Sequence, residues 1–198
     1  MVVPNKKICF LTALKAEATP LINQFKLIRD HKYNFPVFKN HNYSLIVIGV
    51  GYPKIKERFS GFFKNKSVFK FHKIINIGIS GGNKKSVIIG EPYLIKEVLE
   101  GASKKSFTLF IKQKKISTLK SLTSVKKPIY ANSQKYIDLV DMEAYKICEI
   151  LEEYKIIDKL MIIKIVSDYM DEDIFKLAKE DINTLIKKNI SFLIDSIS

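Results

Sequence analysis

Three carboxylate side chains stand beside apolar segments in a chain whose basic residues outnumber its acidic ones, 34 to 20. Glu17 follows the first apolar run, Glu143 lies near the start of an amphipathic segment, and Asp168 follows a later apolar run. A carboxyl group in a semi-buried site can hold a proton near neutral pH and deliver it as a general acid. Taken singly, each of these residues has an ordinary structural explanation as a helix cap or a solvated side chain.

The segments around these carboxylates are expected to bring them together. Short β-branched or aromatic runs, typical of buried strands, occur at residues 7–13, 73–77 and 160–166. Ligand sites in open α/β sheets lie beyond the carboxyl ends of such strands, where Glu17 and Asp168 are placed. The residues Gly78–Gly82 are predicted to form a turn after their strand, at the same edge.

The remaining pattern completes one α/β domain, residues 1–198. Helices are expected from residue 16, with Pro20 in the first turn, and at 53–63, 139–154 and 171–197. Further strands are expected at 36–38, 43–48, 87–99, 107–111 and 116–125. Strands followed by helices, with a strand and a helix at the end, predict a three-layer sandwich around a central mixed β-sheet.

The amino-acid composition limits the kinds of binding partner that the chain is expected to have. The net charge is +14, but nearly all of the positive charge is lysine scattered along the chain, with Arg29 and Arg58 as the arginines. Scattered lysine is typical of a solvated surface and argues against nucleic-acid binding, which favours arginine. No apolar run reaches the ~20 residues of a membrane span, and a cytoplasmic protein is expected. Cys9 and Cys148 lie in apolar patterns and predict no disulfide, and their spacing predicts no metal site.

Several short motifs, in order along most of the chain, resemble the methylthioadenosine/S-adenosylhomocysteine nucleosidases of the nucleoside phosphorylase superfamily. The residues that carry the resemblance are Ala13–Ala18, Val50 between Gly49 and Gly51, Ile75–Gly82 with Ile89–Glu91, Val140–Ala144 and Val166–Asp168. The Asp-Met-Glu-Ala sequence at residues 141–144 is the most specific of them. The resemblance implies a nucleoside phosphorylase-like fold and cleavage of the bond between a purine and a ribose, a reaction of methionine salvage.

The resemblance also implies a role for each matched residue. Asp168 corresponds to the general acid that protonates the leaving purine at N7, with Ser167 orienting it. Glu17 corresponds to the residue that orients and deprotonates the attacking water. Glu143 corresponds to the carboxylate that accepts the ribose hydroxyls, and Met142 packs against the sugar. Core packing is the ordinary alternative for Met142.

Other positions are expected to form the substrate pocket. Val50 lies in the matched glycine-bracketed turn, and the backbone at Gly81 and Gly82 would let the nucleoside approach closely. A serine that helps to hold the water in the family aligns with Ile79 here, and the adjacent Ser80 is the candidate to replace it. Lys164 lies where the family's hydrolases carry an arginine. Lysine keeps the positive charge but lacks the planar guanidinium group, which can make two parallel hydrogen bonds. The loop over the base, residues 126–139, is shorter than in the family, and Ile129 or Tyr130 is the candidate to cover the purine.

The chain leaves alternatives open. Phosphorylases of the superfamily place a glycine-rich, arginine-bearing loop after the first strand, where this chain has Glu17. Hydrolysis by water is therefore preferred to phosphorolysis, although Lys164 could serve an oxyanion. A degenerate, non-catalytic nucleoside-binding protein is the alternative of another class. By resemblance a homodimer is expected, in which a neighbouring subunit lends apolar residues to the 5′ pocket. No cofactor or metal is expected, since His31, His41 and His72 fall outside the motifs.

Overall fold

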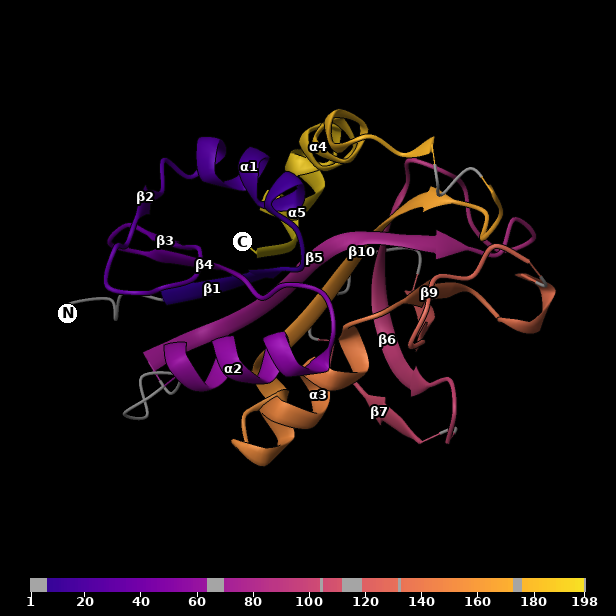
Figure 1. Cartoon of the computed structure of the whole chain (residues 1–198), viewed down its shortest axis with the longest axis horizontal. Helices are drawn as coiled ribbons and strands as arrows, with labels where there is room; N and C mark the ends of the chain where they lie inside the picture. The colour runs from indigo at the N-terminus through magenta and orange to yellow at the C-terminus, as the bar shows by residue number, and fades with distance from the viewer. Residues whose placement is uncertain are drawn as a thin grey trace.

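The computed structural model describes residues 7–63, 70–103, 105–111, 119–131, 133–172 and 176–197. In this part of the chain one mixed sheet of ten strands has the order β10-β6-β8-β9-β5-β1-β4-β3-β2, and β7 pairs with β6 (Figure 1). The strands are β1 (Lys7–Thr12), β2 (Ile28–Arg29), β3 (Val37–Lys39), β4 (Tyr43–Val47), β5 (Phe71–Gly82), β6 (Pro92–Glu100), β7 (Ser106–Thr108), β8 (Leu119–Ser124), β9 (Leu139–Asp141) and β10 (Leu160–Asp168).

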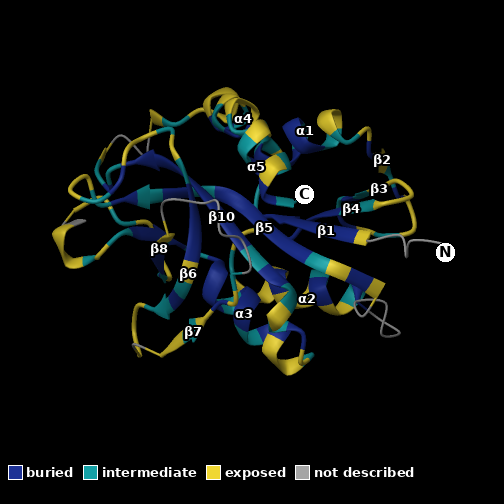
Figure 2. Cartoon of the chain, turned by 180° about the vertical axis from the view of Figure 1, so that it is seen from behind, coloured by how far each residue is buried: buried dark blue, intermediate teal, exposed yellow. Residues whose placement is uncertain are grey.

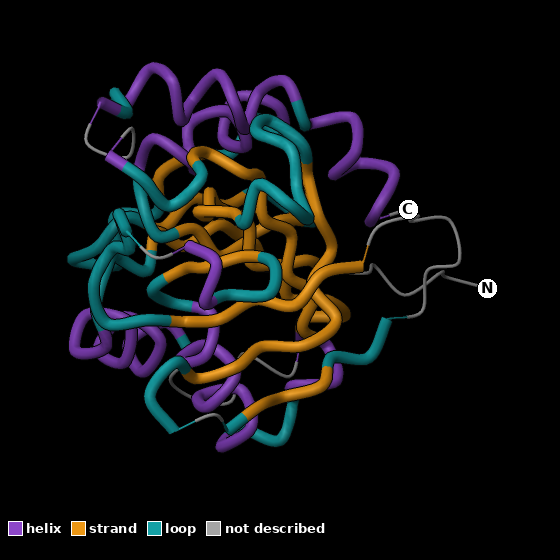
Figure 3. Tube along the Cα trace, turned by 90° about the vertical axis from the view of Figure 1, so that its right-hand side faces the viewer, coloured by secondary structure: helices purple, strands orange, loops and turns teal. Residues whose placement is uncertain are grey.

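Helices cover both faces of this sheet, which confirms the predicted three-layer sandwich (Figures 1 and 3). One face carries α1 (Lys15–Gln24), α4 (Lys179–Lys188) and α5 (Ile190–Ile197), and the other carries α2 (Tyr52–Phe62) and α3 (Ala144–Glu153). Two short 3-10 turns lie at Ser133–Lys135 and Ile157–Lys159. None of the helices in the described residues is long and apolar enough to cross a membrane.

The core divides into two clusters because side chains alternate along each strand. In β1, Leu11 packs with Phe59 of α2 in one cluster, and Phe10 packs with Leu21 of α1 in the other. The central strands are accordingly the most buried part of the molecule (Figure 2). Two cysteines are buried in the first cluster as free thiols, Cys9 and Cys148.

Half of the sheet closes on itself, which the sequence did not predict. The long strand β5 pairs with β10, β10 with β6, β6 with β8, β8 with β9, and β9 returns to β5. Because β5 belongs to both halves, its last residues, Gly81 and Gly82, pair with β9 beside the end of β10. The ring thus brings the ends of β5, β9 and β10 together.

The prediction of a turn at Gly78–Gly82 is wrong, because these residues continue β5. Their backbone groups pair with β10 as far as Gly81 opposite Asp168. Glycine is needed for close packing here: a Cβ at Gly78 would lie 2.7 Å from Glu17 Oε1, and one at Gly82 would lie 2.3 Å from Val87 Cγ2.

The predicted helix over 139–154 begins later. Leu139–Asp141 forms β9, between β5 and β8, and α3 starts at Ala144. An Asp141 oxygen accepts the Ala144 backbone N–H at 3.0 Å, so Asp141 caps the helix from outside it. Met142 and Glu143 form the short link between strand and helix.

The C-terminal helix predicted over 171–197 is also different. The structure has α4 and α5, separated at Asn189, and residues 173–175 lie outside the described part of the chain. Pro20 lies in the second turn of α1, not the first. The carbonyl of Ala16, which loses its helical partner there, accepts a hydrogen bond from Asn183 of α4 at 3.5 Å.

The other predicted elements are confirmed with shifted ends. The strand predicted over 87–99 begins only at Pro92, because residues 83–91 make a turn. The strand predicted over 107–111 is Ser106–Thr108, and the one predicted over 116–125 is described from Leu119 to Ser124. The first strand, the 36–48 pair and the helix after Pro53 lie where they were expected.

Candidate active site

A cavity of about 160 Å³ lies where the carboxyl ends of several strands meet. Four carboxylates line it: Glu17 from α1, Asp141 from β9, Glu143 before α3, and Asp168 at the end of β10. The remaining lining is apolar or small, namely Ala13, Leu14, Val50, Ile79, Ser80, Gly81, Val125, Pro128, Ile129, Val140, Met142, Ser167 and Met170. All three carboxylates singled out in the sequence thus meet at one cavity.

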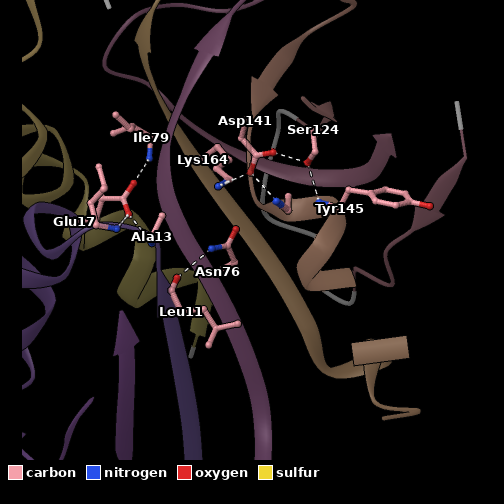
Figure 4. A network of polar contacts seen from close by, with 11 residues as sticks. Leu11, Ala13, Glu17, Asn76, Ile79, Ser124, Asp141, Tyr145 and Lys164 are labelled. Carbon is pink, nitrogen blue, oxygen red and sulfur yellow. Dashed lines mark hydrogen bonds and ion pairs between the residues drawn. The ribbon is translucent and has the colours of Figure 1, made fainter. Parts of the chain in front are cut away.

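Glu17 is held by backbone N–H groups from two elements (Figure 4). Its Oε2 accepts from Ala13 at 2.8 Å and Leu14 at 2.9 Å, and its Oε1 accepts from Ile79 of β5 at 3.0 Å. Burial raises the pKa of Glu17, while the charge of Lys164 and the three N–H groups oppose this shift. Glu17 is therefore both the cap of α1 and a fixed carboxylate at the cavity wall.

Asp168 is fixed by its own turn. Its Oδ1 accepts the Met170 backbone N–H at 2.8 Å, and its Oδ2 lies 2.6 Å from Ser167 Oγ. The same hydroxyl lies 3.2 Å from the carbonyl oxygen of Ser80 in β5. Met170 takes a positive φ of 58° in this turn. In the ordinary alternative Asp168 caps a helix from Asp171, and that stretch runs into residues 173–175, which lie outside the described part of the chain.

At the start of α3, Glu143 has the N-cap position, but Asp141 provides the side chain that caps the helix. Glu143 occupies the N-cap position but makes no side-chain hydrogen bond to the helix. Asp141 Oδ2 accepts the Ala144 N–H, and Asp141 Oδ1 accepts from Ser124 Oγ at 2.5 Å. The same Ser124 oxygen accepts the Tyr145 N–H at 2.8 Å. The motif at residues 141–144 includes Asp141 but predicts no separate role for it.

Lys164 lies behind the cavity wall. Its Nζ lies 2.9 Å from Asp141 Oδ2, and both side chains are almost fully buried (Figure 4). Burial alone lowers the pKa of Lys164, but the carboxylates of Asp141, Glu143 and Glu17 outweigh it and raise the pKa above its usual value. The ammonium is therefore held as a cation shared by three acids.

The surroundings of Glu143 strongly favour its protonated form. Burial, and then the charges of Asp141 and Glu17, raise its pKa to about 8, although Lys164 and the Met142 backbone oppose the shift. Glu143 thus holds a proton at neutral pH in the unliganded site. A group titrating this far from its usual range is typical of a functional site.

The other predicted pocket residues fall into two groups. Val50, Ser80, Gly81, Met142 and Ser167 line the cavity. Gly49 and Gly51, on either side of Val50, both take positive φ. Lys164 and Gly82 lie outside the lining residues, and Gly82 packs against Val87 and Val166.

The structure adds residues that the sequence analysis missed or left open. Ile129 lines the cavity, whereas Tyr130 is 57% exposed and is not part of the lining. Ser80 Oγ is buried and has no hydrogen-bond partner among the described residues, which leaves it available to a ligand. Met170, Val125 and Pro128 were missed, because they follow strand ends in loops that carry no motif. Within the described residues, no three His, Cys, Asp or Glu side chains are arranged to hold a metal ion.

No protein-family model matches the sequence, and no curated protein sequence matches it either. Solved structures do match over nearly the whole chain. A 5′-methylthioadenosine nucleosidase from Arabidopsis thaliana matches with a TM-score of 0.81 and 17% identity, over 98% of this chain and 95% of its own. A 5′-methylthioadenosine/S-adenosylhomocysteine nucleosidase from Helicobacter pylori, solved with butyl-thio-DADMe-Immucillin-A, matches with a TM-score of 0.78 and 14% identity, over 97% of each chain.

A futalosine hydrolase from Helicobacter pylori has the same arrangement, with a TM-score of 0.75 and 14% identity over 98% of this chain and 97% of its own. At these identities the likeness establishes the fold. The nucleoside phosphorylase-like fold expected from the sequence motifs is thereby confirmed.

Proposed function

We propose that this chain, which has the fold of the methylthioadenosine nucleosidases, is an N-ribosyl hydrolase of adenine-type nucleosides. Methylthioadenosine and S-adenosylhomocysteine are the candidate substrates. The observation that carries the proposal is the lining of the cavity: four carboxylates and, among the residues described, no basic side chain. Cleavage of an N-glycosidic bond builds positive charge on the ribose, and an acidic cavity stabilises that charge.

Three of these acids then have separate tasks in the reaction. Asp168 protonates the purine at N7 as the bond breaks. Glu17, oriented by three N–H groups, positions a water molecule and takes its proton. Glu143 accepts the ribose hydroxyls, and Met142 packs against the sugar. Both Glu143 and Met142 come from the link before α3, so the sugar is held by a single segment.

The contacts of Ser167 support the role proposed for Asp168. Ser167 Oγ donates to Asp168 Oδ2 at 2.6 Å and also lies 3.2 Å from the Ser80 carbonyl oxygen of β5. A serine hydroxyl has one hydrogen to donate, and the shorter contact is the one to the carboxyl group. Ser167 thereby orients Asp168 beside the end of β5, at the cavity.

The cavity also favours water over phosphate as the nucleophile. A phosphorylase needs donors and positive charge to hold the anion. The candidate cation, Lys164, is bound to Asp141 behind the wall. Phosphorolysis would place an anion against Glu17, with no cation in the described lining to hold it. Val50, Ser80, Gly81 and Ile129 would line the nucleoside pocket, with Ile129 in place of an aromatic residue over the base.

We further propose that the chain works as one cytoplasmic domain in methionine salvage, as a homodimer and without metal or organic cofactor. Support for the dimer comes from the rim of the cavity. The side chain of Val50, which lines the cavity, is 41% exposed. Tyr52, which lines an adjoining pocket that shares Val125 and Met142 with the cavity, is 38% exposed, so a neighbouring subunit packed here would cover the 5′ substituent. A chelator is expected to leave activity unchanged.

A panel of purine nucleosides tests the activity. Methylthioadenosine, S-adenosylhomocysteine, adenosine and inosine are incubated with the protein in phosphate-free buffer, and free base is measured by chromatography. Adenine release from the 5′-thio nucleosides is expected. Saturable binding of these nucleosides without release of base would instead support the non-catalytic alternative.

A further inference from the structure

The buried ion pair between Lys164 and Asp141 has no direct place in the proposed chemistry. Lys164 Nζ does not line the cavity, yet its positive charge interacts with three of the carboxyl groups that do: Asp141, Glu143 and Glu17. A buried lysine is costly unless it is paired. What the pair does for the site follows from the other partners of Asp141.

Asp141 and Ser124 together take the two N–H groups that begin α3. Asp141 Oδ2 accepts from Ala144, and Ser124 Oγ, itself bound to Asp141 Oδ1, accepts from Tyr145. The first N–H groups of a helix need acceptors, and the N-cap side chain commonly supplies one. Here the N-cap residue is Glu143, and its carboxylate makes no such bond.

We propose that Lys164 is a positioning residue: by neutralising and binding Asp141, it keeps Asp141 on the start of α3 and so leaves Glu143 to face the cavity. Without the ammonium, Asp141 would be a buried carboxylate beside two others and would be driven to protonate or to turn away. Glu143 would then be drawn away from the cavity toward the helix start. As the N-cap residue it can accept the second or third N–H of the helix, so Tyr145 would regain an acceptor and Ala144 would not. The inference about Glu143 and the ribose rests on the proposed function, whereas the inference about the helix start does not.

The first measurement therefore needs no substrate. Amide hydrogen exchange at Ala144 and Tyr145 is compared in the wild type, Lys164→Met and Lys164→Arg, with the amides of β1 as an internal control. We expect Lys164→Met to speed exchange at Ala144 at least tenfold, roughly the effect of opening a local structural unit, and to change exchange at Tyr145 less, because Glu143 replaces its acceptor. Lys164→Arg, which keeps the charge, should remain close to the wild type.

A double variant, Lys164→Met with Asp141→Asn, shows whether faster exchange comes from the unpaired charge of Asp141 or from a general loss of stability. In this variant both side chains are neutral, so no buried charge is left unpaired. Slow exchange should return in this double variant. If Lys164→Met folds only when Asp141→Asn is added, the pairing role is supported in the same way. Unchanged exchange in Lys164→Met, or an arginine variant no better than methionine, would overturn the proposal.

The second measurement concerns the sugar. In the wild type, kcat/KM should be higher for a nucleoside with both ribose hydroxyls than for its 3′-deoxy analogue. Lys164→Met should reduce this preference and lower kcat/KM for the ribose substrate by about a hundredfold, the scale of a small misplacement of a catalytic group. An undiminished preference contradicts the link to Glu143. If the wild type has no activity, the proposed function fails. The exchange measurement still tests whether Lys164 keeps Asp141 at the start of α3.

Discussion

At the scale of single residues, the site separates its carboxylates by their hydrogen-bond partners. Glu17 is surrounded by backbone donors, Asp168 by a hydroxyl and one N–H, and Glu143 by other charges. Carboxyl groups in such different surroundings can hold different protonation states at one pH. This is the property that a reaction with one acid and one base requires.

Asp168→Asn should abolish cleavage while nucleoside binding remains. Asparagine has nearly the same size and can hydrogen-bond the purine, but it cannot deliver a proton. General acid catalysis contributes on the order of 10²- to 10⁴-fold, so kcat of Asp168→Asn should fall at least on that scale. The kcat of Glu17→Gln should fall similarly, because glutamine cannot take a proton from the attacking water. Turnover and equilibrium binding of methylthioadenosine measure the two effects. Asp158→Asn, at an exposed aspartate, is the matched control. Near-normal turnover by Asp168→Asn would remove this turn from the mechanism.

The pH dependence should follow Glu143. Its pKa of about 8 means that the free enzyme carries the protonated form at neutral pH, whereas the cationic sugar requires the carboxylate. The kcat/KM should therefore rise with pH through about 8, because this parameter reports the free enzyme. Glu143→Gln should lower kcat/KM and weaken ribose binding. Its kcat/KM should no longer rise with pH through about 8. Glu153→Gln, on the exposed end of α3, should keep this rise.

The same shift has a consequence for stability. The pKa of Glu143 is raised on folding, so the folded chain binds more protons than the unfolded chain between the usual carboxylate pKa and about 8. The contribution of Glu143 to stability is therefore lost as pH rises through that window. Glu143→Gln, which cannot ionise, should have a higher Tm than the wild type at pH 8. A lower Tm there would contradict the buried, proton-holding environment.

At the scale of elements, β5 and the start of α3 shape the cavity. The strand runs on through Gly78, whose lack of a side chain admits Glu17 from α1. The sequence motifs gave the approximate places of Glu17, Glu143 and Asp168, because all three follow or precede strongly patterned segments. They could not show β9 or the unbroken β5, because both depend on pairing with strands far away in the chain.

Gly78→Ala should damage the site through Glu17. The new Cβ would come within 2.7 Å of Glu17 Oε1, which is already bound to the Ile79 N–H. Moving the carboxylate breaks a hydrogen bond to a charged group, a loss of about 1.5–3 kcal/mol, and misdirects the water. We expect kcat to fall more than tenfold with a smaller change in KM. Gly61→Ala, whose Cβ would meet the Phe35 ring at 3.0 Å away from the site, is the packing control and should keep its kcat.

At the scale of the whole molecule, the closed half of the sheet holds the acids in one place. The ring of β5, β10, β6, β8 and β9 fixes the ends of strands that are distant in the sequence. The fold class could be predicted from the order of strands and helices. The ring could not, because the pairing of β10 with both β5 and β6 leaves no local signal in either strand.

The assembly is expected to be a homodimer. Analytical ultracentrifugation should give twice the chain mass of 22.8 kDa at concentrations at which the protein is active. Dilution until the mass falls should weaken binding of 5′-substituted nucleosides more than of adenosine, because the neighbouring subunit would cover the 5′ group. A monomeric mass throughout the active range would contradict the shared pocket.

The sugar product shows whether the acidic cavity directs water to the ribose. Methylthioadenosine is incubated with the protein with and without inorganic phosphate, and adenine and sugar are followed by proton and phosphorus NMR. We expect adenine and free methylthioribose at equal rates in both buffers, since Glu17 faces the cavity and Lys164 does not. A sugar 1-phosphate, or release of adenine only when phosphate is present, would contradict it.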